Sequence, residues 1–133
     1  MKKENMRSRK KILIVLFGLL IVSYIAVSIW ISNDVRKILV VGMQNNSNYA
    51  PYMTEDVYKK INPYLRHLTN EIKPYRKNDH MLKPVLSLHI FPFAKAWTSH
   101  RYDAPGFGFN EQVQLTLRFK DGRWRAVDAH IEP

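Results

Sequence analysis

The chain has 133 residues, no cysteine and a formal net charge of +10. The lack of cysteine excludes disulfide bonds and thiolate-zinc sites as ways of stabilising the fold. Six of the 21 basic residues precede a long apolar segment, with Glu4 as the one acid there, so the remaining sequence holds 15 basic against 10 acidic residues. This modest excess does not indicate nucleic-acid binding.

Residues 12–31 form an uncharged apolar segment that predicts a transmembrane helix. Fourteen of these twenty residues are Leu, Ile, Val or Phe. At about 1.5 Å per residue, a helix of this length spans about 30 Å, which matches the hydrocarbon core of a bilayer. We therefore expect the chain to interact with the lipid bilayer through this segment.

The charges that flank the apolar segment predict its orientation. Residues 1–11 are strongly basic, whereas Arg36 and Lys37 on the other side lie close to Asp34. The positive-inside rule makes residues 1–11 a cytoplasmic tail and places the C-terminal domain outside the cytoplasm, in a single-pass protein of the cell membrane. A cleaved signal peptide is the alternative. Ala26-Val27-Ser28 resembles a cleavage site, but the apolar run continues beyond it.

Residues 32–53 predict a juxtamembrane helix and a linker. Apolar residues occupy one face of this helix at Val35, Ile38, Leu39 and Met43. The helix either stands alone or continues the transmembrane helix. Residues 44–52 are polar and contain a proline, which predicts a loop. The extracytoplasmic domain is expected over residues 54–133.

Residues 54–73 predict further helix. Thr54 is suited to cap a helix N-terminus, and the two acids that follow it complement the helix dipole. Apolar residues then recur every three or four positions, at Val57, Ile61, Leu65, Leu68 and Ile72. Pro63 interrupts this stripe, so the helix either kinks there or ends, with Asn62 capping a second helix.

From Pro84 onward apolar and polar residues alternate, which predicts β-strands. Strands are expected at 84–90 and 93–102, and a turn or exposed loop at 103–108. A hairpin follows, with strands on either side of the two-residue turn Asp121-Gly122. The expected fold class is α+β: an N-terminal transmembrane helix, then short helices packed on a curved antiparallel sheet of about four strands.

The segment Phe-Lys-Asp-Gly-Arg-Trp-Arg-Ala-Val at 119–127 resembles the closing hairpin of NTF2-like domains. The order of helices before sheet is also similar to that family and to the related cystatin-like shape. The resemblance implies a cone-shaped domain with a pocket, which such proteins use as enzymes, for ligand binding or for assembling membrane complexes. Bacterial envelope proteins with one N-terminal anchor and such a domain include secretion and conjugation components.

The register of the hairpin predicts one candidate catalytic pair. A two-residue turn pairs Phe119 with Trp124, and strand alternation then turns Asp128 and His130 toward the apolar face. A carboxylate and an imidazole that face inward at i and i+2 are able to act as an acid–base pair. A bulge at Ala126-Val127 is the alternative, and it would leave both side chains in solvent.

Aromatic residues supply the other candidates. Trp97, Phe119 and Trp124 are the residues expected to line a ligand pocket, if one is closed. Phe107 and Phe109, with Trp97 and Tyr102 nearby, predict either an exposed patch that docks a partner or ordinary core packing. The five histidines show no metal-ligand spacing, so we expect neither a metal site nor a cofactor.

These observations favour a membrane-anchored extracytoplasmic interaction module in a bacterial envelope assembly. Its expected partners are other envelope proteins and the bilayer, with no nucleic acid. A domain that binds a small molecule or a wall polymer is the alternative. An enzyme that uses Asp128 and His130 is the least favoured interpretation.

Overall fold

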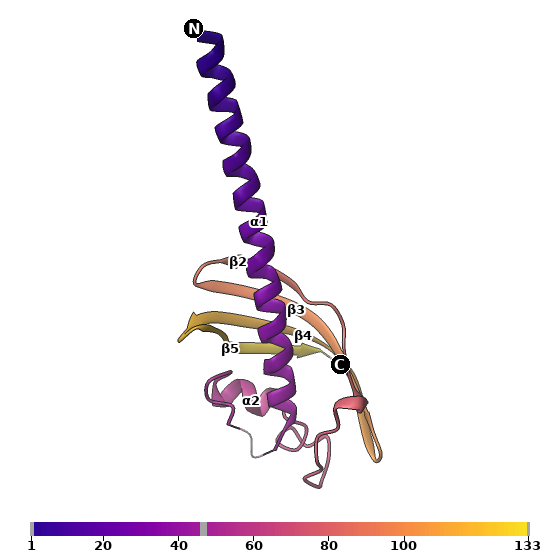
Figure 1. The fold of residues 1–133 in the computed structure, drawn as a ribbon. Coiled ribbons are helices and arrows are strands. Elements are labelled where there is room, and N and C mark those ends of the chain that lie inside the picture. The colour runs from indigo at the N-terminus through magenta and orange to yellow at the C-terminus, as the bar shows by residue number, and fades with distance from the viewer. Residues whose placement is uncertain (1, 46–47, 133) are drawn as a thin grey trace.

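The computed structural model describes residues 2–45 and 48–132. One continuous helix, α1, covers Lys2–Met43, and its N-terminal half projects away from the rest of the fold (Figure 1). It is long and apolar enough to cross a membrane, and its most apolar stretch is not covered by any other part of the chain that is described. A candidate membrane span is therefore present where the sequence predicts it.

The C-terminal part of α1 belongs to the core of the folded domain. Ile31, Val35, Ile38 and Leu39 are fully buried and pack with residues of the sheet. The juxtamembrane helix therefore continues the predicted transmembrane helix and does not stand alone. The packing also joins the expected juxtamembrane helix to the domain, because burial of this apolar stripe supplies much of the hydrophobic stabilisation.

Five antiparallel strands form the sheet, and with the helices they confirm the predicted α+β class. The strands are β1 (His80–Leu82), β2 (Leu86–Ile90), β3 (Phe93–Ala104), β4 (Phe107–Lys120) and β5 (Arg123–Glu132). Their order is β1-β3-β4-β5, and β2 pairs with another stretch of β3. The segment 103–108, expected as a turn or exposed loop, contains a tight turn at residues 105 and 106, with Gly106 at φ +96°. The rest of the segment is strand, because this turn joins β3 directly to β4.

Helix α1 crosses the strands of the sheet in succession (Figure 1). Tyr24 contacts His89 on β2, Trp30 contacts Phe119 on β4, and Asp34 accepts a hydrogen bond from the Trp124 backbone on β5. From Tyr24 to Trp30 the helix rises about 9 Å. Two strand spacings are also about 9 to 10 Å, so these six residues of helix match the step from β2 past β3 to β4.

The helix predicted after Thr54 is much shorter than its apolar stripe. Helix α2 covers Glu55–Ile61, and the Thr54 hydroxyl caps it by accepting from the Val57 N–H. The Asn62 side chain then accepts from the N–H groups of Tyr64 and Leu65, which makes a turn and not a second helix. The expectation of helix through Ile72 is therefore wrong, since Pro63 and the Asn62 turn stop it.

Candidate functional site

The β4–β5 hairpin follows the predicted register only as far as its bulge. Phe119 pairs with Trp124 and Leu117 with Ala126, but the register shifts between Thr116 and Leu117. Beyond the shift Thr116 faces Asp128, and Ala129 takes the buried position opposite Leu115. The bulge at Ala126-Val127 is thus the alternative that holds, because one extra residue reverses the facing of every later side chain.

Asp128 and His130 consequently do not form an inward acid–base pair. Their side chains are 67% and 68% exposed. Asp128 accepts from the Lys60 ammonium at 3.2 Å, and this hydrogen bond lowers the pKa of the carboxyl. His130 instead lies 3.1 Å from a carboxylate oxygen of Glu132. The catalytic interpretation loses the geometry on which it depended.

The three residues expected to line a pocket do not share one face of the sheet. Trp97 pairs with Leu86 and Gln114 on the face of the sheet that α1 does not cover. Trp124 is buried on the opposite face, with its ring 5.4 Å from that of Phe119. Phe119 in turn contacts Trp30 of α1. Strand alternation therefore prevents a common pocket of these side chains.

Phe107 and Phe109 are both half-buried and belong to neither of the predicted extremes, the exposed patch or the hydrophobic core. Both rings lie on the inner face of β4 and contact the buried Tyr102, at centroid distances of 5.4 and 6.0 Å. Phe109 is half-buried and also lines an open groove. One of the two predicted patch residues thus reaches a candidate binding surface.

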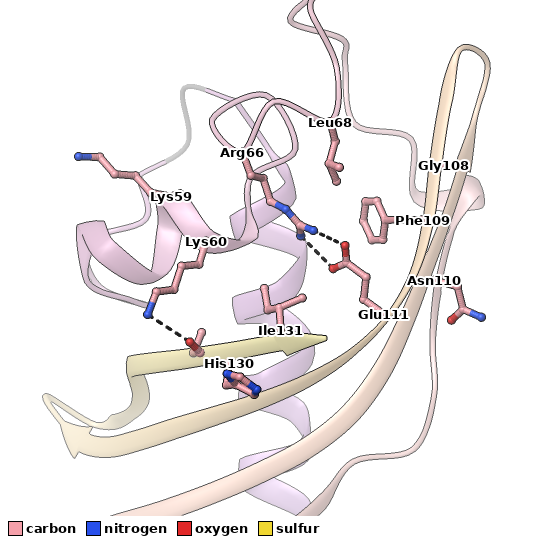
Figure 2. A pocket seen from close by; sticks show the side chains of 11 residues that line it. Lys59, Lys60, Arg66, Leu68, Gly108, Phe109, Asn110, Glu111, His130 and Ile131 are labelled. Atoms are coloured by element: carbon pink, nitrogen blue, oxygen red, sulfur yellow. Dashed lines mark hydrogen bonds and ion pairs between the residues drawn. The ribbon is translucent and has the colours of Figure 1, made fainter. Parts of the chain in front are cut away.

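That groove lies between α2, the turn that follows it and the concave side of β4 and β5. Its volume is about 850 Å³. Lys60 and Arg66 reach into it from one side, while Phe109 and Ile131 contribute apolar surface from the sheet (Figure 2). The groove therefore offers hydrogen-bonding and apolar contacts together, which is typical of binding sites.

The edge of β5 forms one wall of this groove. Near the start of the strand, the edge is already paired: the Ala126 carbonyl accepts from the Thr54 N–H, and the Ala126 N–H donates to the Tyr52 carbonyl. Further along, the Ala129 N–H donates to the Asp128 carboxylate and the Ala129 carbonyl accepts from Lys60. By alternation, the backbone N–H and carbonyl of Ile131 face the same edge.

A buried ion pair holds the turn after α2 against the sheet. The Arg66 guanidinium donates two hydrogen bonds to the Glu111 carboxylate, one of them at 2.9 Å (Figure 2). Glu111 is only 3% exposed. Burial acts to raise the pKa of Glu111, but His100 and Arg66 outweigh it and hold that pKa below its ordinary value.

The polar contacts continue from Glu111 through two histidines to a tyrosine. His100 Nε2 lies 3.5 Å from the Glu111 carboxylate, His80 Nε2 lies 3.0 Å from His100 Nδ1, and the Tyr75 hydroxyl lies 2.7 Å from His80 Nδ1. A carboxylate only accepts, so His100 must present its Nε2–H to Glu111. In the neutral tautomer of His100 the Nδ1 atom is an acceptor, so that His80 donates to His100 and Tyr75 donates to His80.

Burial shifts the pKa values at the far end of this chain of contacts. Burial, together with a smaller effect of the nearby His100, lowers the pKa of His80 from 6.5 to about 4. Burial also raises the pKa of Tyr75 to about 12. Both groups are thus kept neutral near pH 7, as the direction of the hydrogen bonds requires.

Sequence reasoning missed this cluster because it depends on β1. His80 and His100 are twenty residues apart, and only the pairing of β1 with β3 brings them together. A strand of three residues leaves almost no alternation to detect. Glu111, by contrast, occupies a position of the β4 alternation that predicts burial, and a buried carboxylate signals a partner.

The lowered pKa of His80 predicts acid sensitivity. Since the folded value is about 4 and the ordinary value 6.5, the unfolded chain binds more protons between these pH values. Stability is therefore complete above about pH 6.5 and falls as the pH decreases toward 4. We expect a loss of about 2 kcal/mol from pH 7 to pH 5, measured by urea unfolding of the full chain in detergent.

His80→Gln should remove this loss, because glutamine does not titrate. His130→Gln is the matched control, since that histidine is exposed and should leave the pH dependence unchanged. If the free energy of unfolding fell with pH as steeply in His80→Gln as in the parent chain, the acid sensitivity would not come from His80.

Within residues 2–45 and 48–132, no three His, Asp or Glu side chains are grouped to hold a metal ion. No protein-family model, no curated protein and no solved structure matches this chain.

Proposed function

We propose that the chain is a single-pass membrane protein whose folded domain works outside the cytoplasm as a protein-interaction module. The apolar, uncovered N-terminal half of α1 supports the anchor, and the basic tail supports a cytoplasmic N-terminus. The setting that we infer is a bacterial envelope assembly. The resemblance to NTF2-like domains remains part of this proposal and is compatible with a curved sheet that forms a groove.

One observation carries the proposal: among residues 2–45 and 48–132, no partner pairs with the outer edge of β5 at Ile131, so this part of the edge is open inside the groove. The chain already adds its own segment 52–54 to the first part of that edge, in the parallel direction. Lys60 and Asp128 form hydrogen bonds with the backbone carbonyl and N–H of Ala129. Such side-chain contacts protect an edge strand from aggregation with other strands. An extended segment of a partner would extend this pairing at Ile131, by strand addition.

The walls of the groove indicate what such a segment would carry. An apolar side chain would contact Phe109, Leu68 and Ile131, which line the groove together. Lys59 pairs with Glu55 at 3.0 Å, but its side chain is 60% exposed, and such an exposed pair is weak enough for a carboxylate of the partner to compete with it. We infer a partner segment with an apolar residue close to an acidic one.

Photo-crosslinking in cells tests this function. A benzophenone amino acid replaces Leu68 in the groove of the full chain. In a control it replaces Gln112, which is exposed on the face of β4 opposite to that of the buried Glu111 and Val113. We expect a discrete adduct with an envelope protein from position 68 and none from position 112. Equal adducts from both positions would contradict a groove-directed partner.

Strand addition itself is tested by combining the position 68 probe with Ile131→Pro. Proline removes an N–H that lies on the open edge, so the β4–β5 ladder keeps its own hydrogen bonds. We expect the adduct to disappear with Ile131→Pro and to persist with the matched Ile131→Val. Unfolding curves of both variants show whether the fold is retained. An adduct that survives in folded Ile131→Pro would reject strand addition.

A further inference from the structure

A group of exposed apolar side chains lies on β2 and the turn that leads to β3. We call this group the β2 patch. It consists of Leu86, Leu88, Ile90, Phe91 and Phe93, which are 58% to 85% exposed. Leu86, Leu88 and Ile90 share one face of β2, and Phe93 pairs with Ile90. Phe91, in the turn, extends the patch around the end of the sheet, since its ring lies 5.1 Å from that of Phe119 on the other face. Contiguous apolar surface of this kind indicates a contact with another apolar body.

The β2 patch lies beside the apolar part of α1. The imidazole of His89 stacks on the ring of Tyr24 at a centroid distance of 4.0 Å. The His89 N–H also donates to the Tyr24 hydroxyl at 3.4 Å, so the helix satisfies a backbone group on the outer edge of β2. Of the labelled strands, β2 is the one closest to the projecting half of α1 (Figure 1).

The length of the helix determines the depth of β2 in a bilayer. If the hydrocarbon core begins at Ile12, about 30 Å of helix extends to Ile31. Tyr24 is seven residues before Ile31, which corresponds to about 10 Å of rise. A tilted helix needs more residues to cross the same thickness, so tilt would place Tyr24 deeper still. The strand that contacts Tyr24 therefore lies at the level of the acyl chains.

The residues next to the β2 patch suit the headgroup region. Lys95 and Arg118 are exposed on the same face of the sheet, opposite Leu88 and Phe93 respectively. They lie one and two strand spacings, about 5 and 10 Å, farther from the N-terminal half of α1. Arg118 is thus at the boundary itself, and Lys95 reaches it by extending its long side chain. Trp97 is half-buried on this face, beside Leu86. Cationic and Trp side chains above an apolar band match a membrane interface.

We propose that the β2 patch is embedded in the outer leaflet of the membrane, so that the edge of the sheet and helix α1 enter the lipid together. This inference rests on the proposed function, because it requires α1 to be a membrane anchor. The lipid contact is distinct from the partner groove, which lies at the opposite end of the sheet beside α2. The domain would then be fixed in both height and rotation relative to the bilayer.

The absence of native cysteine allows a direct test with single labels. Leu20→Cys, Leu88→Cys and Asp128→Cys in the full chain each receive an environment-sensitive fluorophore, in vesicles of phosphatidylcholine and phosphatidylglycerol. Asp128 lies in the same cross-strand row as Leu88, but on β5, and is the matched aqueous control. Quenching by spin-labelled lipid is compared with quenching by iodide.

We expect lipid quenching to exceed iodide quenching at least twofold at Leu20 and Leu88, and the reverse at Asp128. A lipid-quenched Leu20 label with a Leu88 label that behaves like Asp128 would overturn the inference and leave the anchor intact. A Leu88 label protected from both quenchers would also overturn it, because a protein would then cover the patch. A Leu20 label that lipid does not quench would refute the anchor itself.

Discussion

Arg66→Met is expected to destabilise the full chain by about 3 to 5 kcal/mol. The substitution leaves the Glu111 carboxylate buried, at 3% exposure, without the cation that neutralises it. A buried charge that loses its partner keeps the whole cost of desolvation. Urea unfolding in detergent at pH 7, followed by tryptophan fluorescence, measures the loss.

Arg101→Met is the matched control for this prediction. Arg101 also pairs with a carboxylate, that of Asp103 at 2.8 Å, but both side chains are more than half exposed. Removing an exposed pair costs less than about 1 kcal/mol. Adding Glu111→Gln to Arg66→Met should recover part of the lost stability, because a neutral amide is cheaper to bury. A loss no greater than that of Arg101→Met would contradict a structural role for the buried pair.

The ion pair also connects stability with the proposed function. Arg66 belongs to the turn that borders the groove, and Glu111 belongs to β4 on its opposite side (Figure 2). Their contact fixes the width of the groove where Phe109 lies, since the Arg66 guanidinium also lies 5.6 Å from that ring centroid. We therefore expect Arg66→Met to weaken the position 68 adduct as well.

Local signals in the sequence predicted most of the sheet but not its details. The β4–β5 hairpin has alternating residues and an Asp121-Gly122 turn, and both turn residues adopt positive φ, as such a turn requires. The bulge was visible only as two consecutive apolar residues, Ala126 and Val127. One inserted residue was enough to move Asp128 and His130 from the expected core to the surface, which no alternation rule can anticipate by itself.

Other features depended on tertiary contacts that a linear pattern does not contain. The apolar stripe of residues 57–72 suggested a long helix, yet Leu65, Leu68 and Ile72 are exposed and lie outside α2. The apolar residues of β2 suggested a strand with one buried face, but Leu86, Leu88 and Ile90 are all exposed. Both errors arise because a hydrophobic pattern shows that burial is favourable without showing which surface covers it. For β2, the proposed cover is lipid.

Helix α1 is both a candidate membrane span and an element of the domain core, so the two parts of the chain are rigidly connected. Ile31 and Leu39 are fully buried in the domain, whereas Leu20 is 69% exposed on the same helix. No flexible linker separates the two parts, since α1 is continuous from Lys2–Met43. The groove is thus held at a fixed distance from the apolar half of α1, which suits a module that must meet a partner at one height above a membrane.

Gly42→Val is expected to destabilise the chain by about 3 kcal/mol, through overpacking where α1 meets α2. A Cβ at Gly42 would lie 2.5 Å from Ile61 Cγ2 and 3.0 Å from Ile61 Cβ. Ile61 is fully buried, so it has no free space into which to move. Urea unfolding of the full chain in detergent again measures the change.

Gly18→Val is the matched control, because nothing lies within 4 Å of a Cβ at that position. It should change the free energy of unfolding by less than about 1 kcal/mol. Displacement of Ile61 would also move Asn62, which donates to the Gly42 carbonyl at 3.2 Å and shapes the turn that carries Arg66. Gly42→Val should therefore reduce the position 68 adduct under conditions where the domain is still folded. Equal free energies of unfolding for the two valine variants would contradict this prediction. They would show that Ile61 makes room for the new side chain, so that the contact between α1 and α2 does not fix the groove.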